Sequence, residues 1–158
     1  MIMLDFSNWA QWGNRLDLLK DLHFPGVYAL LISDDDMSGK PFEWQKEIVY
    51  FGMTNSVTGL KGRLSQFNNT LHDKRGHGGG ERFRFDYGDG ADLAKKLFVS
   101  VCPFACEGHE NTPANLRIFG TVAMAEYIAF AEYVDRYGAL PKYNDKKVSP
   151  KRKKSGFH

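Results

Sequence analysis

Two apolar runs decide the fold of this chain: GVYALLIS at residues 26–33 and EIVYFGMT at residues 47–54. Both runs are rich in β-branched and aromatic side chains, which favour strands. The segment between them, DDDMSGKPFEWQK, contains the turn signals Gly39 and Pro41. The pattern predicts an antiparallel pair of strands joined by a long loop, and hence a fold built on a small, largely antiparallel sheet.

Helical spacing predicts a helix on each side of this pair. Upstream, Ser7 is placed to cap a helix over residues 7–22, in which four apolar residues recur at helical intervals: Trp9, Trp12, Leu16 and Leu19. Downstream, a second amphipathic helix has four apolar residues on one face: Leu60, Leu64, Phe67 and Leu71. The predicted architecture is a mixed α+β fold in which helices flank the sheet.

Two further strands are predicted in the second half of the chain. At residues 82–87 arginine or aspartate alternates with phenylalanine or tyrosine, which is the period of a half-buried strand. A short helix near residues 92–97 precedes another strand candidate at residues 98–101. The sheet should therefore have three or four strands.

The last predicted element is the longest helix, and it carries a carboxylate among its apolar residues. Thr112 is placed as its cap, Pro113 opens it, and Gly138 stops it after Tyr137. Its apolar residues recur three and four apart: Phe119, Ala123, Phe130, Tyr133 and Tyr137. Glu126 fills one position of this series. Because burial of an unpaired carboxylate is costly, Glu126 should be neutralised, paired in a core salt bridge, or bound to a metal.

The composition fits a single globular domain over residues 1–145. Of the 158 residues, 42% are hydrophobic and 25% are charged, which excludes a disordered, collagenous or coiled-coil chain. The longest apolar run, residues 27–32, is too short to span a bilayer. We therefore expect a cytoplasmic protein with no membrane partner.

Basic residues are concentrated in two places. Residues 146–158 contain 6 lysines and arginines and no acidic residue. This tail should be disordered, and it either contacts nucleic-acid phosphates or only aids solubility. A second basic group lies within residues 61–84, in an otherwise acidic body, and five of its side chains are expected to bind nucleic acid: Lys61, Lys74, Arg75, Arg82 and Arg84.

The residues of the two central strands resemble a known family. The tripeptides GVY at residues 26–28 and YFG at residues 50–52 are similar to the two halves of the motif of the GIY-YIG endonucleases. Three more residues follow in the order of that family: Arg63 on a helix, Glu126 on a later helix, and Asn144 in the closing LPKYN segment. The resemblance covers most of the chain and implies a GIY-YIG nuclease-like fold.

The resemblance implies a metal-dependent endonuclease, a hydrolase that cuts phosphodiester bonds in double-stranded DNA. Glu126 would hold one Mg²⁺ (or Mn²⁺) against the scissile phosphate, and a single carboxylate suits this metal. Arg63 would stabilise the phosphoryl charge with its planar guanidinium. Tyr28 and Tyr50 would position or deprotonate the attacking water. Asn144 would hold the site by hydrogen bonds.

Two departures from the family pattern leave other functions open. Many members of the family have a lysine directly after the second tripeptide, where this chain has Met53. The connection between Tyr28 and Tyr50 is also about twice the usual length, which can alter substrate recognition. One alternative is a catalytically inactive nucleic-acid-binding module on the same fold. Another is a protein-interaction domain that uses exposed aromatic side chains.

Overall fold

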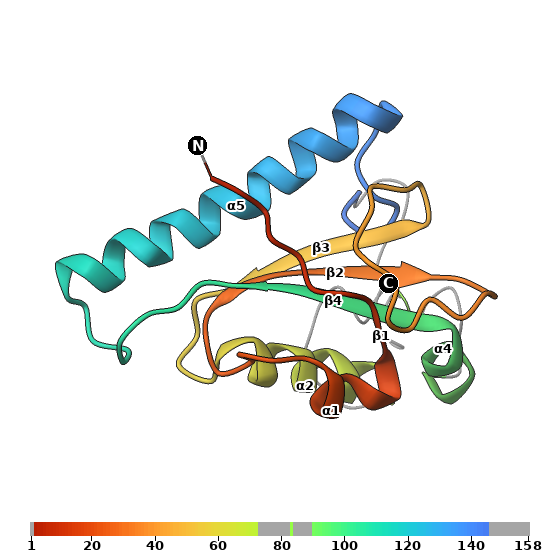
Figure 1. Cartoon of the computed structure of the whole chain (residues 1–158), viewed down its shortest axis with the longest axis horizontal. Coiled ribbons are helices and arrows are strands. Elements are labelled where there is room, and N and C mark those ends of the chain that lie inside the picture. The colour runs from red at the N-terminus through yellow and green to blue at the C-terminus, as the bar shows by residue number, and fades with distance from the viewer. Residues whose placement is uncertain (1, 73–82, 84–89, 146–158) are drawn as a thin grey trace, which may run out of the picture.

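A four-stranded antiparallel sheet forms the centre of the computed structural model, which describes residues 2–72, 83 and 90–145. The strands, in sheet order, are β1 (Ala10–Gln11), β4 (Leu97–Pro103), β2 (Gly26–Ile32) and β3 (Ile48–Thr54). The helices are α1 (Arg15–Leu18), α2 (Gly59–Leu71), α4 (Gly90–Lys96) and α5 (Pro113–Tyr137). Figure 1 shows α5 on one face of the sheet and α1, α2 and α4 on the other. The predicted class, mixed α+β with an antiparallel sheet, is confirmed.

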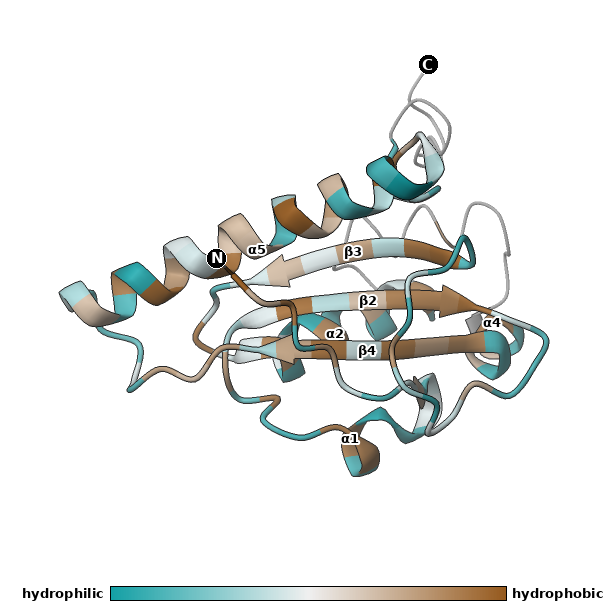
Figure 2. Cartoon of the chain, turned by 45° about the horizontal axis from the view of Figure 1, so that its top comes forward, coloured by the Kyte–Doolittle hydropathy of each residue, from teal (hydrophilic) through white to brown (hydrophobic). Residues whose placement is uncertain are grey.

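The central pair of strands forms as predicted. β2 and β3 are antiparallel, with Tyr28 opposite Gly52 and Leu30 opposite Tyr50. β2 also pairs with β4 over its whole length, so it lies in the middle of the sheet and its apolar run is buried on both faces. Figure 2 shows hydrophobic residues along both β2 and β4.

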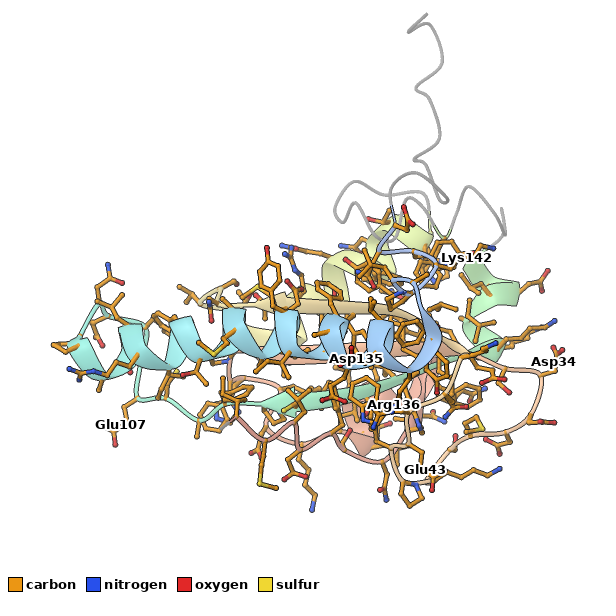
Figure 3. All side chains as sticks on the ribbon, turned by 90° about the horizontal axis from the view of Figure 1, so that it is seen from above. Asp34, Glu43, Glu107, Asp135, Arg136 and Lys142 are labelled. Carbon is orange, nitrogen blue, oxygen red and sulfur yellow. The ribbon has the colours of Figure 1, made fainter. Side chains whose placement is uncertain are left out.

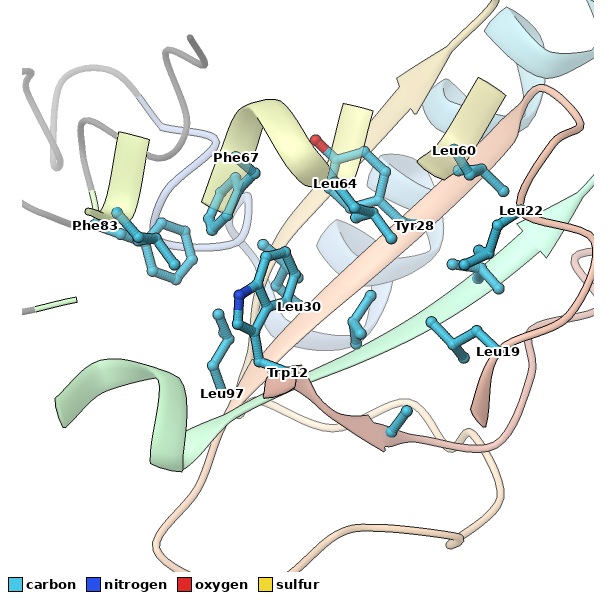
Figure 4. Close-up of a cluster of buried hydrophobic side chains, with 14 of the residues drawn as sticks. Trp12, Leu19, Leu22, Tyr28, Leu30, Leu60, Leu64, Phe67, Phe83 and Leu97 are labelled. Atoms are coloured by element: carbon cyan, nitrogen blue, oxygen red, sulfur yellow. The ribbon is translucent and has the colours of Figure 1, made fainter. Parts of the chain in front are cut away.

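The pleat of the strands sends alternate side chains into two cores. Tyr28 and Leu30 face α2, where a cluster of buried side chains includes Leu60, Leu64 and Phe67 (Figure 4). Ala29, Leu31 and Phe51 face the opposite way and pack against Ala129 and Tyr133 of α5. The two motif tyrosines therefore share the α2 face, because Tyr50 packs against the same cluster as Tyr28.

The predicted N-terminal helix over residues 7–22 is wrong. Residues 2–9 have no helical turn, and only α1 and a short 3-10 turn, Trp12–Asn14, follow β1. The reason is pairing with a distant strand: the Ser7 N–H donates to the Val101 carbonyl at 2.8 Å, and the Val101 N–H donates to the Ser7 hydroxyl at 3.0 Å. Trp9 and Trp12 are still buried, so their spacing reflects a core without a helix.

The predicted strand at residues 82–87 is wrong at Phe83, the one residue of that segment within the described ranges. Phe83 is helical, is fully buried, and stacks on Tyr143 with ring centroids 4.1 Å apart. Its burial comes from ring packing and needs no sheet partner. The rest of this segment, and the basic tail over residues 146–158, lie outside the described residues.

The long helix α5 has the predicted ends. The Asn115 N–H donates to the Thr112 hydroxyl at 3.1 Å, and Gly138 stops the helix with φ of 79°. The buried face, however, is displaced from the predicted series: it consists of Asn115, Val122, Ala125, Ala129 and Tyr133. Small alanines allow the helix to pack closely on the sheet. Glu126 consequently lies at the border of the buried face and is only partly buried.

No helix within the described ranges combines the length and the apolar character that crossing a bilayer demands. The cytoplasmic location and the single domain over residues 1–145 stay predictions from the sequence.

Candidate active site

The candidate site lies at β3, the edge strand in the described part of the sheet, where α2 and α5 approach from opposite faces. β2 supplies Tyr28 and β3 supplies Tyr50. α2 supplies Arg63 and α5 supplies Glu126. The charges of both Arg63 and Glu126 act on the Tyr28 hydroxyl, so the structure brings these four predicted residues together.

Tyr28 is fully buried and reaches this edge by crossing over Gly52 on the neighbouring strand. A Cβ atom at Gly52 would collide with the ring and the hydroxyl of Tyr28. Gly52 is therefore needed to let Tyr28 lie flat across β3. In the sequence, Gly52 stands out only as part of the YFG tripeptide. The signal that could have found its role is an isolated glycine inside a strand pattern.

The two tyrosines form a hydrogen-bonded pair, with ring centroids 6.0 Å apart. Burial is the main reason that the pKa of Tyr28 lies well above 10, and the hydroxyl of Tyr50 raises it further, while the Arg63 guanidinium lowers it. The hydrogen bond to Tyr50 also raises the pKa of Tyr28, so this bond favours the protonated phenol. Tyr28 is consequently a neutral hydrogen-bond donor.

Arg63 is fixed against β3 through its own hydrogen bonds. Its Nε donates to the Met53 carbonyl at 3.4 Å, and its Nη1 donates to Gln66 Oε1 at 3.2 Å. A guanidinium has about five N–H donors. Within the described part of the chain, those not used in these two bonds have no protein acceptor. Arg63 is thus oriented by the strand and keeps donors for an anion.

Glu126 is a partly desolvated carboxyl group. Burial raises its pKa from 4.5 to about 7, and the nearby Arg63 charge lowers it. Within the described ranges, no Lys or Arg side chain forms an ion pair with Glu126. The core salt bridge considered from the sequence therefore finds no partner among those residues.

Asn144 acts on the backbone beside Tyr50. Its Nδ2 donates to the Phe51 carbonyl at 2.8 Å, and the Phe51 N–H donates to its Oδ1 at 2.9 Å. One residue before, the Tyr143 N–H donates to the Val49 carbonyl at 2.9 Å. The closing segment therefore pairs with the outer edge of β3 on both sides of Tyr50. Asn144 is a positioning residue that fixes the strand under Tyr50.

Met53 lies on the other side of the sheet from the tyrosines. Its side chain packs with Val27, Val122 and Ala125 in the core under α5. The position after the YFG tripeptide therefore provides packing here, and the side chain of Met53 adds no charge to the tyrosine pair.

Among the predicted phosphate-binding residues, the structure describes only Lys61, which is exposed on α2. The four others lie outside the described residues: Lys74, Arg75, Arg82 and Arg84. Lys61 and Arg63 belong to the same helix but are two residues apart, so their side chains point in different directions.

The donor set fits a magnesium ion better than a structural metal. Within the described residues there is no group of three or more His, Cys, Asp or Glu side chains that could enclose a metal. Glu126 is a single, partly desolvated carboxylate beside an arginine, and Mg²⁺ commonly binds one or two carboxylates together with substrate phosphates and water.

The chain matches no model of a protein family, no curated protein and no solved structure. The resemblance to the GIY-YIG endonucleases therefore rests on the sequence motifs of this chain alone.

Proposed function

We propose that this chain is a metal-dependent DNA endonuclease that hydrolyses phosphodiester bonds, with Glu126 as the protein ligand of one Mg²⁺ or Mn²⁺. One observation carries the proposal: Arg63 and Glu126 come from helices on opposite faces of the sheet, and the charges of both act on the Tyr28 hydroxyl. A fold has no structural need to place a desolvated carboxyl, an arginine and two tyrosines at one edge, and perturbed ionisable groups cluster at functional sites.

The chemistry is divided among these side chains. Arg63 binds the phosphate oxygens through its remaining N–H donors and stabilises the charge that develops on them. When bound at Glu126, the divalent cation supplies Lewis-acid polarisation of the phosphate and a lower pKa for water. The guanidinium and the cation would both stabilise the negative charge that develops during hydrolysis of a phosphodiester.

Tyr50 is the better candidate to orient the attacking water. Tyr28 is fully buried and its hydrogen bond to Tyr50 favours the protonated form, so Tyr28 acts as a donor to Tyr50. Tyr50 is only partly buried, and its backbone is fixed by Asn144 through Phe51. Tyr28 would therefore support Tyr50, and Tyr50 would contact the water.

The first test is cleavage of a supercoiled plasmid with Mg²⁺, with Mn²⁺, and with EDTA. We expect nicked or linear DNA with either metal and intact plasmid with EDTA. Arg63→Lys should reduce the rate by about 100-fold, because an ammonium group cannot reproduce the bidentate contact. Equal cleavage with and without EDTA would contradict the proposal.

A second candidate is a nucleic-acid-binding module without catalysis, and the state of Tyr28 favours it. A phenol that burial keeps protonated is a poor base, and Met53 offers no charge to activate it. This candidate predicts a gel shift of duplex DNA that weakens with salt, together with intact plasmid at every metal concentration. The plasmid assay therefore separates the two candidates.

A further inference from the structure

The outer side of α5 carries a stripe of exposed residues that the candidate site does not use. Six residues lie on one side of the helix at intervals of three and four: Leu116, Gly120, Met124, Tyr127, Ala131 and Val134. Tyr127 is 72% exposed and Met124 is 57% exposed. All six are apolar or small, although they point away from the sheet. We call this set the outer stripe.

The outer stripe has no cover within the described residues. Figure 3 looks down on α5, which crosses the molecule in front of the sheet along its whole length. The opposite side of the helix is already packed on the sheet through residues such as Val122 and Ala129. A helix that is apolar on both sides is typical of a buried helix, and a contiguous exposed apolar patch marks an interaction site.

The order of side chains along the stripe is symmetric. Leu116 and Val134 lie at the two ends of the stripe. Next to them, toward the centre, lie the small residues Gly120 and Ala131. The large Met124 and Tyr127 lie at the centre. If a second copy of α5 lies antiparallel on the first, each residue meets its counterpart of similar size. Large side chains then fill the middle of the contact, and small ones allow the backbones to approach on either side.

Charges beside the stripe obey the same symmetry. Arg117 and Asp135 lie on one flank, near opposite ends of the stripe, and both are exposed. Neither side chain makes an ion pair within the described part of the chain. In the antiparallel arrangement Arg117 faces Asp135 of the second copy, and the same pair forms twice because the contact is two-fold symmetric.

We propose that the outer stripe of α5 is the interface of a homodimer, in which two copies of α5 pack antiparallel about a two-fold axis between Met124 and Tyr127. The helix has 25 residues, which corresponds to a length of about 37 Å. The outer stripe covers about 27 Å of that length, from Leu116 to Val134, and the partly buried Phe119 and Phe130 flank it. The proposal does not depend on the nuclease function.

The first experiment is sedimentation velocity of the full chain over a range of protein concentrations. The chain has a mass of 18.0 kDa, so a dimer should appear at about 36 kDa. Tyr127→Lys combined with Met124→Lys should return the mass to 18.0 kDa. Leu16→Lys is the matched control, because Leu16 is 51% exposed on α1, on the other side of the sheet.

Charge reversal then tests the register. Arg117→Asp alone and Asp135→Arg alone should each weaken dimerisation at least about tenfold, because like charges then meet. The double variant should regain the wild-type affinity, since the pair is restored with opposite polarity. Circular dichroism checks that each variant is folded, and these exposed positions leave the core untouched.

Spin labels test the direction of packing. In a Cys106→Ser background, a label at Leu116→Cys should give a distance of roughly 30 Å across the dimer, and one at Tyr127→Cys roughly 10 Å. Equal short distances would indicate a parallel pair. A monomer at every concentration, a dimer that survives the lysine variants, or a parallel pair would overturn the proposal.

Discussion

Glu126 is held partly out of water beside the Arg63 guanidinium, and this environment has a measurable effect on stability. Burial raises its pKa in the folded protein to about 7, whereas the unfolded chain has the ordinary value near 4.5. Between these two pH values the folded protein retains a proton that the unfolded chain has lost. The free energy of unfolding therefore falls as the pH rises through this window.

The first prediction follows from that linkage. From pH 5 to pH 8 the wild type should lose about 1–2 kcal/mol more stability than Glu126→Gln, whose side chain does not titrate. Urea denaturation of both proteins at several pH values measures the difference. Glu132→Gln serves as the matched control, because it removes one carboxylate from another part of the same helix, where Glu132 pairs with Arg136. Parallel curves for wild type and Glu126→Gln would mean that the carboxyl is ordinarily solvated.

Gly52 and Tyr28 form the second residue-scale test. Gly52→Ala places a methyl group where the Tyr28 ring lies, so it should lower the free energy of unfolding by about 2–3 kcal/mol. In a Tyr28→Ala background the same change should cost less than about 1 kcal/mol, because the ring is gone. Chemical denaturation of the four proteins completes the cycle. Additive losses would show that the ring does not cross Gly52.

Among the secondary-structure elements, those with a strong local pattern could be predicted from the sequence. β2 and β3 are short apolar runs with turn signals between them, and α5 has a threonine cap, a proline at its start and a terminal glycine. The N-terminal segment could not be predicted, because Ser7 pairs with Val101 on a distant strand. The helical spacing of the tryptophans correctly indicates that they are buried. The backbone conformation of the segment, however, is set by its hydrogen bonds to Val101.

The edge of β3 is likewise held by a residue that is distant in the sequence, because Asn144 forms two hydrogen bonds to the Phe51 backbone. Asn144→Ala removes both hydrogen bonds to Phe51, so it should lower the free energy of unfolding by about 1–3 kcal/mol and loosen the strand under Tyr50. Hydrogen exchange of the Phe51 amide measures the loosening directly. Asn14→Ala, at an exposed position after β1, should leave that amide unchanged. Unaltered protection of Phe51 in Asn144→Ala would contradict a positioning role.

At the scale of the whole molecule, the candidate site exists because three layers meet at one strand edge. The sequence indicated Tyr28, Tyr50, Arg63 and Glu126 through their order and their resemblance to a family. It could not show that Arg63 reaches the Met53 carbonyl or that Gly52 makes room for Tyr28, since both depend on packing between separate elements. It also misplaced the buried face of α5, because Ala125 and Ala129 lie at its centre while Phe119 and Phe130, which the pattern placed there, are only partly buried.

The same three-layer arrangement gives α5 two separate tasks. Its inner face packs on the sheet, and Glu126 lies at the border of that face near β3. The outer stripe points away from both. Variants of the outer stripe should therefore change the oligomeric state of the protein while leaving the surroundings of Glu126 intact.

The most direct measurement is the initial rate of plasmid nicking in saturating Mg²⁺ by the wild type, Glu126→Gln and Glu132→Gln. These variants remove one carboxylate each from the same helix, and only Glu126 faces Arg63 and the tyrosines. We predict metal-dependent nicking that Glu126→Gln slows by at least about 100-fold and Glu132→Gln leaves within about twofold of the wild type. Equal rates for all three proteins, or no nicking by the wild type at any metal concentration, would contradict the assignment of the site.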